Sequence, residues 1–212
     1  MNRIKVKLPF TDIEIEQLEG GHPVTEAADF LQKTVADKVR KTEVRGLELG
    51  AGNGIITLML ALQKPDWQLR GIELQKELVD LAERNNARLG LSCRFTLGDL
   101  REFRSQLDYK GFDIIYGNPP WVKSGSGKVS PDFTRAMSRQ EITCTMADVL
   151  VCIDWCLAED GEAYIVYPME RKADLAKEVM RTELEVSNLF ESELSPRSFI
   201  AKLKRKKLTL KW

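Results

Sequence analysis

The chain has 212 residues, of which 43% are hydrophobic and 30% are charged, and its 32 Lys and Arg equal its 32 Asp and Glu in number. This length and composition predict one globular domain with a substantial core and exclude a disordered chain. A formal net charge of zero argues against a broad electrostatic surface for nucleic acid, although it allows local basic patches.

Scarce residue types exclude further classes of protein. His22 is the only histidine, so neither a zinc site built from histidines nor a nucleophile with a histidine base is expected, and we predict no metal. Because His22 precedes Pro23, a place at the start of a helix is favoured over a substrate contact. The four cysteines have no CxxC spacing, which favours reduced, buried thiols over disulfides.

The amino-terminal sequence and the longest apolar run predict a cytoplasmic protein that does not enter a membrane. Residues 1–7 alternate charged and aliphatic side chains and lack the apolar core of a signal peptide. Residues 55–62 form the longest largely apolar run, which is far below the roughly 20 residues that a membrane-spanning helix needs.

Two short strands and a helix are predicted first along the chain. Aliphatic residues alternate over 4–8 and 13–15 around a turn, which predicts a β-hairpin or a pair of edge strands. After Gly20 and Gly21, apolar residues at helical spacing over 23–41 predict a helix that covers a sheet. We therefore expect a strand extension at 1–22 and a main domain at 23–212, within a single domain overall.

A strand, a glycine turn and a helix are predicted next, over residues 44–62. The turn consists of Gly50, Ala51, Gly52, Asn53 and Gly54, and Glu48 lies two residues before it. Glycines let backbone approach a ligand closely and aim N–H groups at it from the start of the helix. The pattern differs from the dinucleotide fingerprint GxGxxG because Ile55 stands where a third glycine is expected, so the turn alone is weak evidence for a cofactor.

Two acidic residues follow the next predicted strands. A strand over 68–72 ends in Glu73, whose carboxylate could accept hydrogen bonds from both hydroxyls of a ribose. A strand over 93–97 is followed by Asp99, which either caps a short helix or accepts from the amino group of an adenine. Together with Glu73, Asp99 favours the ligand interpretation, and an adenosine-containing cofactor is implied.

The stretch Asn118-Pro119-Pro120-Trp121 follows a fourth short strand, predicted over 112–115. The prolines end that strand, Asn118 offers a carboxamide oxygen beside a backbone carbonyl, and Trp121 offers a flat apolar face. An exocyclic NH2 group can donate both hydrogens to two carbonyls while its ring stacks on the indole. A rigid loop with a core tryptophan is the structural alternative, and the preceding glycine turn favours the ligand site.

The remaining predicted elements complete a doubly wound sheet whose ligands lie at the carboxyl ends of its strands. A polar loop at 122–131 next to the site could form a lid. A helix over 147–158, a strand over 163–167, a helix over 170–181 and strands over 184–190 and 203–212 follow. The last of these is rich in lysine and is either an edge strand protected by lysines or a phosphate-binding strip.

Residues 48–54, Glu73, Asp99 and residues 118–121 together resemble a class I S-adenosylmethionine-dependent methyltransferase of the amino-methylating group with an Asn-Pro-Pro-aromatic motif. Residues 139–145 and 166–171 resemble the corresponding stretches of bacterial tRNA(Val) (adenine-N6) methyltransferases. The resemblance covers most of the chain from Gly20 onward. It implies a Rossmann-like seven-stranded sheet with the last strand antiparallel.

The resemblance also implies roles for single residues. The cofactor, S-adenosylmethionine, would be held at its methionine end by the glycine turn, at its ribose by Glu73, and at its adenine by Asp99 and the Leu100 amide. The expected cofactor-binding residues are Glu48, Gly50, Ala51, Gly52, Asn53, Gly54, Glu73, Leu74, Asp99, Leu100 and Asn118. The expected catalytic residues are Asn118, Pro119, Pro120 and Trp121, and the expected substrate contacts are Trp121, Lys123 and Arg139.

The predicted function is methylation of the N6 amino group of an adenine in tRNA, with S-adenosylhomocysteine as product. A protein glutamine methyltransferase is the nearest alternative, because a carboxamide NH2 presents the same two hydrogens to Asn118. A non-catalytic cofactor-binding subunit and an NAD oxidoreductase are the others. The Asn118 to Trp121 stretch argues against both of them.

Overall fold

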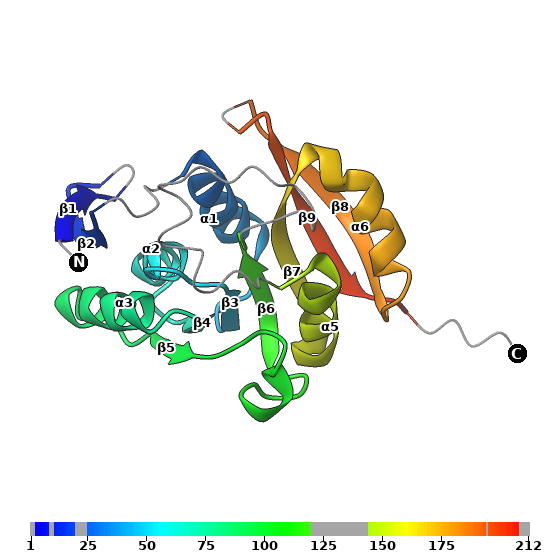
Figure 1. Cartoon of the computed structure of the whole chain (residues 1–212), viewed down its shortest axis with the longest axis horizontal. Helices are drawn as coiled ribbons and strands as arrows, with labels where there is room; N and C mark the ends of the chain where they lie inside the picture. Colours follow the sequence, from blue (N-terminus) through cyan, green and yellow to red (C-terminus); the bar gives the residue numbers. More distant parts are fainter. Residues whose placement is uncertain (1–2, 9–10, 20–24, 120–143, 194, 208–212) are drawn as a thin grey trace, which may run out of the picture.

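The computed structural model describes residues 3–8, 11–19, 25–119, 144–193 and 195–207 (Figure 1). A seven-stranded sheet forms its centre, in the order β5-β4-β3-β6-β7-β9-β8. The strands are β3 (Arg45–Leu49), β4 (Gln68–Glu73), β5 (Arg94–Leu97), β6 (Phe112–Gly117), β7 (Leu157–Pro168), β8 (Leu184–Glu191) and β9 (Ser198–Arg205). The pairings from β5 to β7 are parallel, whereas β9 runs antiparallel to both β7 and β8. The predicted doubly wound sheet with an antiparallel last strand is confirmed.

Helices cover both faces of this sheet (Figure 1). They are α1 (Glu26–Lys38), α2 (Ile55–Gln63), α3 (Lys76–Arg88), α5 (Met146–Cys156) and α6 (Lys172–Val179), with short 3-10 turns η1 (Phe103–Ser105) and η2 (Met169–Arg171). Helices α1, α2 and α3 contribute to one hydrophobic core, and α5 and α6 contribute to a second. Successive residues of the central strands alternate between the two cores, as the two-residue period of a strand requires: Ile114 and Tyr116 belong to the first, and Ile115 to the second. None of the helices in the described ranges is both long and apolar enough to span a bilayer.

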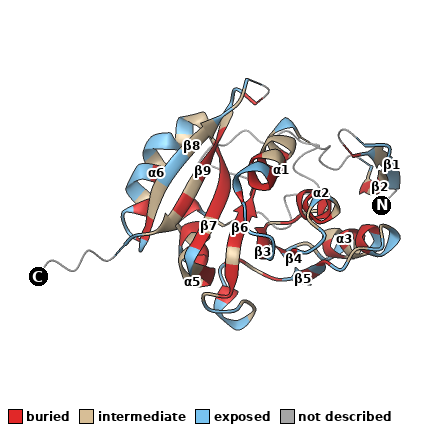
Figure 2. Cartoon of the chain, turned by 180° about the vertical axis from the view of Figure 1, so that it is seen from behind, coloured by how far each residue is buried: buried red, intermediate tan, exposed pale blue. Residues whose placement is uncertain are grey.

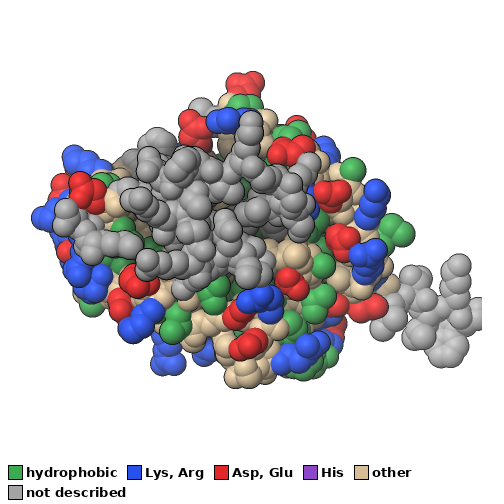
Figure 3. Space-filling model, viewed as in Figure 1, with side chains coloured by type: hydrophobic (Ala, Val, Ile, Leu, Met, Phe, Trp, Pro, Cys, Tyr) green, Lys and Arg blue, Asp and Glu red, His purple; other side chains and the backbone are tan. Residues whose placement is uncertain are grey.

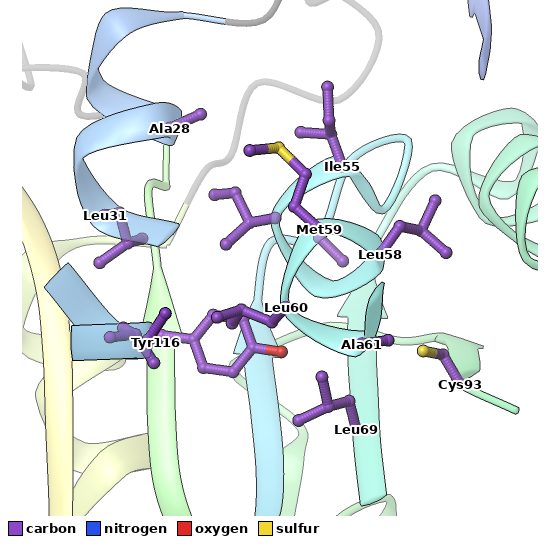
Figure 4. Packing of buried hydrophobic residues seen from close by; sticks show 14 of the residues in the cluster. Ala28, Leu31, Ile55, Leu58, Met59, Leu60, Ala61, Leu69, Cys93 and Tyr116 are labelled. Atoms are coloured by element: carbon purple, nitrogen blue, oxygen red, sulfur yellow. The ribbon is translucent and has the colours of Figure 1, made fainter. Parts of the chain in front are cut away.

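Burial is greatest where the central strands meet these helices, as Figure 2 shows for β6, β7 and β9. The large ring of Tyr116 is fully buried in the first core. Figure 4 shows Leu31 of α1 and Leu60 of α2 beside it, with the tyrosine hydroxyl pointing toward β3 and α2. This packing involves β6, which ends at the carboxyl edge of the sheet, and α2, which begins there after β3.

The predicted amino-terminal hairpin is present as β1 (Arg3–Lys7) and β2 (Glu14–Leu18), which pair antiparallel. The hairpin is fixed to α3 by the side chain of Asn85, whose Oδ1 accepts from the Glu16 N–H at 2.8 Å and whose Nδ2 donates to the Glu16 carbonyl at 2.9 Å. The carboxamide thus satisfies both backbone groups of one edge residue, as a neighbouring strand would. The division of the chain at residue 22 stays a prediction.

Two predicted boundaries near the carboxyl end are wrong. The helix predicted over 147–158 ends at Cys156, and Leu157 already pairs with Phe112 as the first residue of β7. The last described strand, β9, covers Ser198–Arg205 and thus begins five residues before the predicted start at 203, while residues 208–212 of that prediction lie outside the described residues. Because β9 lies between β7 and β8, it is not the lysine-protected edge strand that was one interpretation. Its run of Phe199, Ile200 and Ala201 is buried on both faces, which is typical of a central strand and has no two-residue alternation to reveal it.

Candidate functional site

The glycine turn joins β3 to α2 at the carboxyl edge of the sheet, as predicted. Gly50, Gly52 and Gly54 have φ values of 68°, 55° and 79°, in the left-handed region that favours glycine. A Cβ at Gly54 would also lie 2.6 Å from the Phe95 ring and 3.0 Å from the Ala82 Cβ, so packing excludes a larger residue there. The turn is fixed to β4 because the N–H groups of Gly50 and Ala51 both donate to the Ile72 carbonyl at 3.0 Å.

Glu73, at the tip of β4, holds the far side of this turn. Its Oε2 accepts from the Gly52 N–H at 2.8 Å, and its Oε1 accepts from the Gln75 N–H at 3.0 Å. The residue is 9% exposed, and burial raises the pKa of its carboxyl group despite these backbone hydrogen bonds. Each carboxylate oxygen can accept a second hydrogen bond, which leaves Glu73 able to bind a pair of hydroxyls.

Two exposed leucines lie beside Glu73. Leu74 follows it directly, and Leu97 is its register partner on β5. Their relative exposures are 36% and 49%, which is high among the leucines that the structure describes and provides apolar surface next to the carboxylate. A planar, weakly polar ring would bury this surface.

Glu48 lies beneath the turn rather than on its open side. It is 2% exposed, and its Oε2 accepts from the Thr57 hydroxyl at 2.5 Å and from the Thr57 N–H at 3.1 Å. Burial is the main cause that raises its pKa to about 8, with a smaller contribution from the charge of Glu73. Glu48 therefore joins β3 to the first turn of α2, and its predicted contact with a cofactor stays a prediction.

Asp99 lies after β5 and forms a compact turn with Arg101. Its Oδ1 accepts from the Arg101 N–H at 2.8 Å, and its Oδ2 is 2.5 Å from Nη2 of the Arg101 guanidinium. Hydrogen bonds from Arg101 lower the pKa of Asp99. Asp99 does not cap a helix here, because the residue before η1 is Glu102. Leu100 beside it is buried.

Asn118 and Pro119 lie next to the glycine turn. Strand β6 ends at Gly117, where a Cβ would lie 2.7 Å from the Leu49 carbonyl oxygen, so β6 and β3 approach closely at their carboxyl ends. The Cα and Cβ of Pro119 lie 3.9 Å from the position that a Cβ on Gly50 would take. Asn118 is partly buried and Pro119 is buried. The structure thus brings the Asn-Pro pair and the turn together, as predicted.

Several predicted site residues lie outside the described residues: Pro120, Trp121, Lys123, Arg139 and the proposed lid at 122–131. His22, for which a place at the start of a helix was favoured, also lies outside them. Among the described residues, no three His, Cys, Asp or Glu side chains are grouped as a metal site would need. Cys152 and Cys156, which share a face of α5, are buried free thiols.

Sequence reasoning missed two side chains near the site, Thr57 and Tyr116. Their hydroxyl oxygens lie 2.9 Å apart, and both residues are fully buried. Their positions in the sequence could have indicated them, because Tyr116 lies two residues before Asn118 and Thr57 lies three residues after Gly54. A polar residue within an apolar run at those places indicates a buried partner.

The described part of the face seen in Figure 3 has no single sign of charge. Lys and Arg side chains alternate there with Asp and Glu side chains over the described parts. This matches the equal numbers of basic and acidic residues in the sequence.

Comparisons with known proteins show the family to which the chain is similar. The family described as Methyltransferase small domain matches residues 22–189. The chain is 30% identical over 154 residues to a tRNA1(Val) (adenine(37)-N6)-methyltransferase of Porphyromonas gingivalis, covering 71% of this chain and 60% of that protein. It is also 30% identical over 149 residues to the protein of that name from Shewanella baltica, covering 68% of this chain and 61% of the relative. The chain therefore spans less than two thirds of the length of these relatives.

Solved structures share the fold. A TehB-like S-adenosylmethionine-dependent methyltransferase from Corynebacterium glutamicum superposes with a TM-score of 0.58 at 22% identity, covering 88% of this chain and 90% of that one. A tRNA (uracil-54, C5)-methyltransferase from Pyrococcus abyssi, in complex with S-adenosylhomocysteine, gives 0.61 at 17% identity, covering 95% of this chain and 44% of that one. At these identities the likeness concerns the fold alone.

Proposed function

Since the chain belongs to the Methyltransferase small domain family, we propose that it is an S-adenosylmethionine-dependent N-methyltransferase that acts on the N6 amino group of an adenine in tRNA. The observation that carries this proposal is the placement of Asn118 and Pro119 against Gly50 of the glycine turn. A cofactor held at the turn and an amino group held by Asn118 would then be neighbours. The tRNA acceptor is supported by the names of the relatives at 30% identity.

The described residues fit the cofactor that the family uses, S-adenosylmethionine. A Cβ at Gly52 would meet no described atom within 4 Å, so the turn has an open side. Glu73 offers lone pairs for ribose hydroxyls, and Leu74 and Leu97 offer apolar surface for an adenine ring. When bound, the cofactor supplies a methyl group on a cationic sulfur. We assign its methionine end to Gly50, Ala51, Gly52, Asn53 and Gly54, and its adenine to Asp99 and Leu100.

The acceptor nitrogen would be held by oxygen atoms of this chain. An aromatic amino group is a poor nucleophile because its lone pair is delocalised into the ring. If its two hydrogens are donated to the Asn118 Oδ1 and the Pro119 carbonyl, the nitrogen is oriented and its lone pair becomes more localised. Orientation and fixed dipoles would then provide most of the rate acceleration, and the methyl step would need no general base. The methylated nitrogen would carry the positive charge lost by the sulfur and would release one of its two hydrogens to water as a proton after the transfer. The roles of Pro120, Trp121, Lys123 and Arg139 stay predictions of the sequence.

Asn118→Ala tests this assignment. We expect it to abolish methyl transfer while S-adenosylmethionine still binds, because the turn and Glu73 are unchanged. Labelled methyl transfer should be measured on total tRNA and, in parallel, on a protein extract, with cofactor affinity measured by titration. Asn188→Ala is the matched control and should keep full activity. Asn188 is an exposed asparagine of β8, which is the edge strand three places from β6. Equal loss of binding and transfer in Asn118→Ala would show that Asn118 is structural.

A protein glutamine methyltransferase is the second candidate. The formal net charge of zero favours it, because a chain with as many acidic as basic residues provides no broad basic surface for an RNA backbone. Label that appears only in protein would select this candidate over tRNA. Label in neither, with intact cofactor binding, would favour a non-catalytic subunit.

A further inference from the structure

Three buried side chains form a chain of hydrogen bonds beneath the site. The Thr57 hydroxyl donates to Glu48 Oε2 at 2.5 Å, and the Tyr116 hydroxyl oxygen lies 2.9 Å from the Thr57 oxygen. A threonine hydroxyl has one hydrogen, so with that hydrogen given to Glu48 the tyrosine donates to Thr57. Glu48 is 2% exposed, and Thr57 and Tyr116 are 0% exposed.

Each member of this chain comes from a different element that begins or ends at the site. Glu48 is on β3 and Tyr116 is its register partner on β6, while Thr57 is in the first turn of α2. Glu48 is the residue before the last of β3, and Tyr116 is the residue before the last of β6. The hydrogen bonds therefore lie just inside the carboxyl edge, directly before the glycine turn on one strand and the Asn-Pro pair on the other.

The Tyr116 hydroxyl is not needed to fill the core. Phenylalanine would occupy almost the same volume among Leu31 and Leu60 (Figure 4), and a buried hydroxyl costs free energy unless it has a partner. What the hydroxyl adds is a directional link from β6 to α2 and, through Thr57, to β3. Glu73 and Cys93 are the other titratable groups that face this chain.

We propose that the chain Glu48, Thr57 and Tyr116 couples the glycine turn to the Asn118 end of β6, so that cofactor binding at the turn orders the acceptor side of the site. Thr57 and Tyr116 are positioning residues in this proposal, acting through Asn118 and the turn. The inference rests on the proposed function, which assigns the glycine turn to the cofactor and Asn118 to the methyl acceptor. Its test needs only the cofactor.

Tyr116→Phe breaks the link to β6 and leaves the bond between Thr57 and Glu48 in place. Tyr164→Phe is the matched control: Tyr164 is the register partner of Tyr116 on β7, is equally buried, and donates a hydrogen bond to Glu162 at 2.6 Å that does not lead to the site. Both variants remove one buried tyrosine hydroxyl from neighbouring strands. Because Tyr164 donates to a carboxylate whose pKa is lowered and Tyr116 to a neutral hydroxyl, the melting temperature should fall at least as much in Tyr164→Phe as in Tyr116→Phe.

The decisive measurement is amide hydrogen exchange by NMR, with and without saturating S-adenosylmethionine. We expect exchange at Gly117 and Asn118 in the bound state to be about tenfold faster in Tyr116→Phe than in the wild type, the size of effect that one lost hydrogen bond gives. Protection of residues 50–57 and the affinity for the cofactor should change less than about twofold, because the turn keeps its own contacts. Tyr164→Phe should match the wild type at Gly117 and Asn118.

The proposal is overturned if exchange at Gly117 and Asn118 is unchanged in Tyr116→Phe, or if Tyr164→Phe changes it equally. A second variant, Thr57→Val, should lose protection on both sides, and Thr57→Ser should restore it. On an identified acceptor, Tyr116→Phe should lower kcat about tenfold with little change in the KM for the cofactor. Failure to methylate tRNA would refute the proposed acceptor without affecting the exchange result, so the two failures are distinguishable.

Discussion

Acidic side chains behave in opposite ways at the carboxyl ends of β3 and β4 and on the antiparallel side of the sheet. At the first place, Glu48 and Glu73 accept hydrogen bonds from backbone N–H groups and a hydroxyl, and burial raises the pKa of both. At the second, Glu162 is also partly buried, but its ion pair with Lys202 at 2.7 Å and its hydrogen bond from Tyr164 outweigh that burial and lower its pKa.

The difference lies in the groups to which each carboxylate is hydrogen-bonded. Glu162 has its charge compensated by a lysine of the neighbouring strand. Glu73 is bonded to two uncharged N–H groups, so its charge is stabilised but not cancelled. A ligand with hydroxyl donors or a positive charge would therefore gain more from Glu73 than from Glu162. Four mutations test this contrast, and their expected effects decrease from residues at the site to residues on the surface.

The largest effect is expected for Gly54→Ala in the turn. The new Cβ would lie 2.6 Å from the Phe95 ring at a φ of 79°, which combines overpacking with an unfavourable backbone. We expect a loss of about 3 kcal/mol or more in the free energy of unfolding. Gly90→Ala is the control, because its φ is 65° but no described atom lies within 4 Å of its Cβ position. Urea unfolding should show a loss of about 1 kcal/mol in the free energy of unfolding for Gly90→Ala. Equal losses in the two variants would show that the contact with Phe95 is unimportant.

Glu73→Gln should have the next largest effect, on cofactor affinity. Both carboxylate oxygens accept from backbone N–H groups, so the new amide nitrogen would face either the Gly52 or the Gln75 donor. Together with the lost charge, this should weaken S-adenosylmethionine binding by about 2–3 kcal/mol, or roughly 30- to 150-fold. Calorimetric titration measures it. Glu162→Gln should leave the affinity unchanged, and an equal loss there would contradict the contrast between the two carboxylates.

Glu48→Gln should change how stability depends on pH. The carboxyl pKa is about 8 in the folded chain against an ordinary value of 4.5, so between these values the folded state holds a proton that the unfolded state has lost. The contribution of Glu48 to stability is therefore fully present below about pH 4.5, decreases as pH rises, and is at its lowest above about pH 8. The slope is at most about 1.4 kcal/mol per pH unit.

Glutamine does not titrate, so the wild type minus Glu48→Gln difference in unfolding free energy should decrease from pH 5 to pH 8. Denaturant unfolding at several pH values measures this difference. The pKa of Glu73 is also raised by burial, but Glu73 is present in both proteins, so its contribution to the pH dependence largely cancels in the difference. A difference that is constant with pH would show that Glu48 is ionised throughout.

The strand ends and the glycine turn could be predicted because each has a local cause. Gly50, Glu73 and Asn118 lie where a strand stops, and parallel strands bring such positions to one edge. The prediction placed these residues together without knowing any distance between them. The hydrogen bonds to Glu73 could not be foreseen, because they depend on how closely the turn approaches β4.

The sequence was least informative where contacts are distant along the chain. Strand β9 pairs with β7 and β8, and its lysines face acids on those strands, including Glu162 and Glu185. The sequence alone does not show that these lysines have acidic partners on neighbouring strands, so a run of basic residues suggests an exposed strip. The link between Thr57 and Tyr116 joins residues 59 positions apart, which no local pattern encodes.

The smallest effect is expected for the ion pair between Lys204 and Glu185, whose Nζ and Oε1 lie 3.2 Å apart with side chains 42% and 44% exposed. A double-mutant cycle with Lys204→Ala and Glu185→Ala should give a coupling of about 0.5 kcal/mol or less, because solvent and salt screen such a pair. Lys204→Ala should also leave tRNA affinity and its salt dependence unchanged, since Glu185 compensates the lysine charge. If the basic strand instead binds RNA phosphates, the slope of log affinity against log salt would fall by about 0.9 in this variant. That result would revive the phosphate-binding strip and place an RNA contact on the antiparallel side of the sheet.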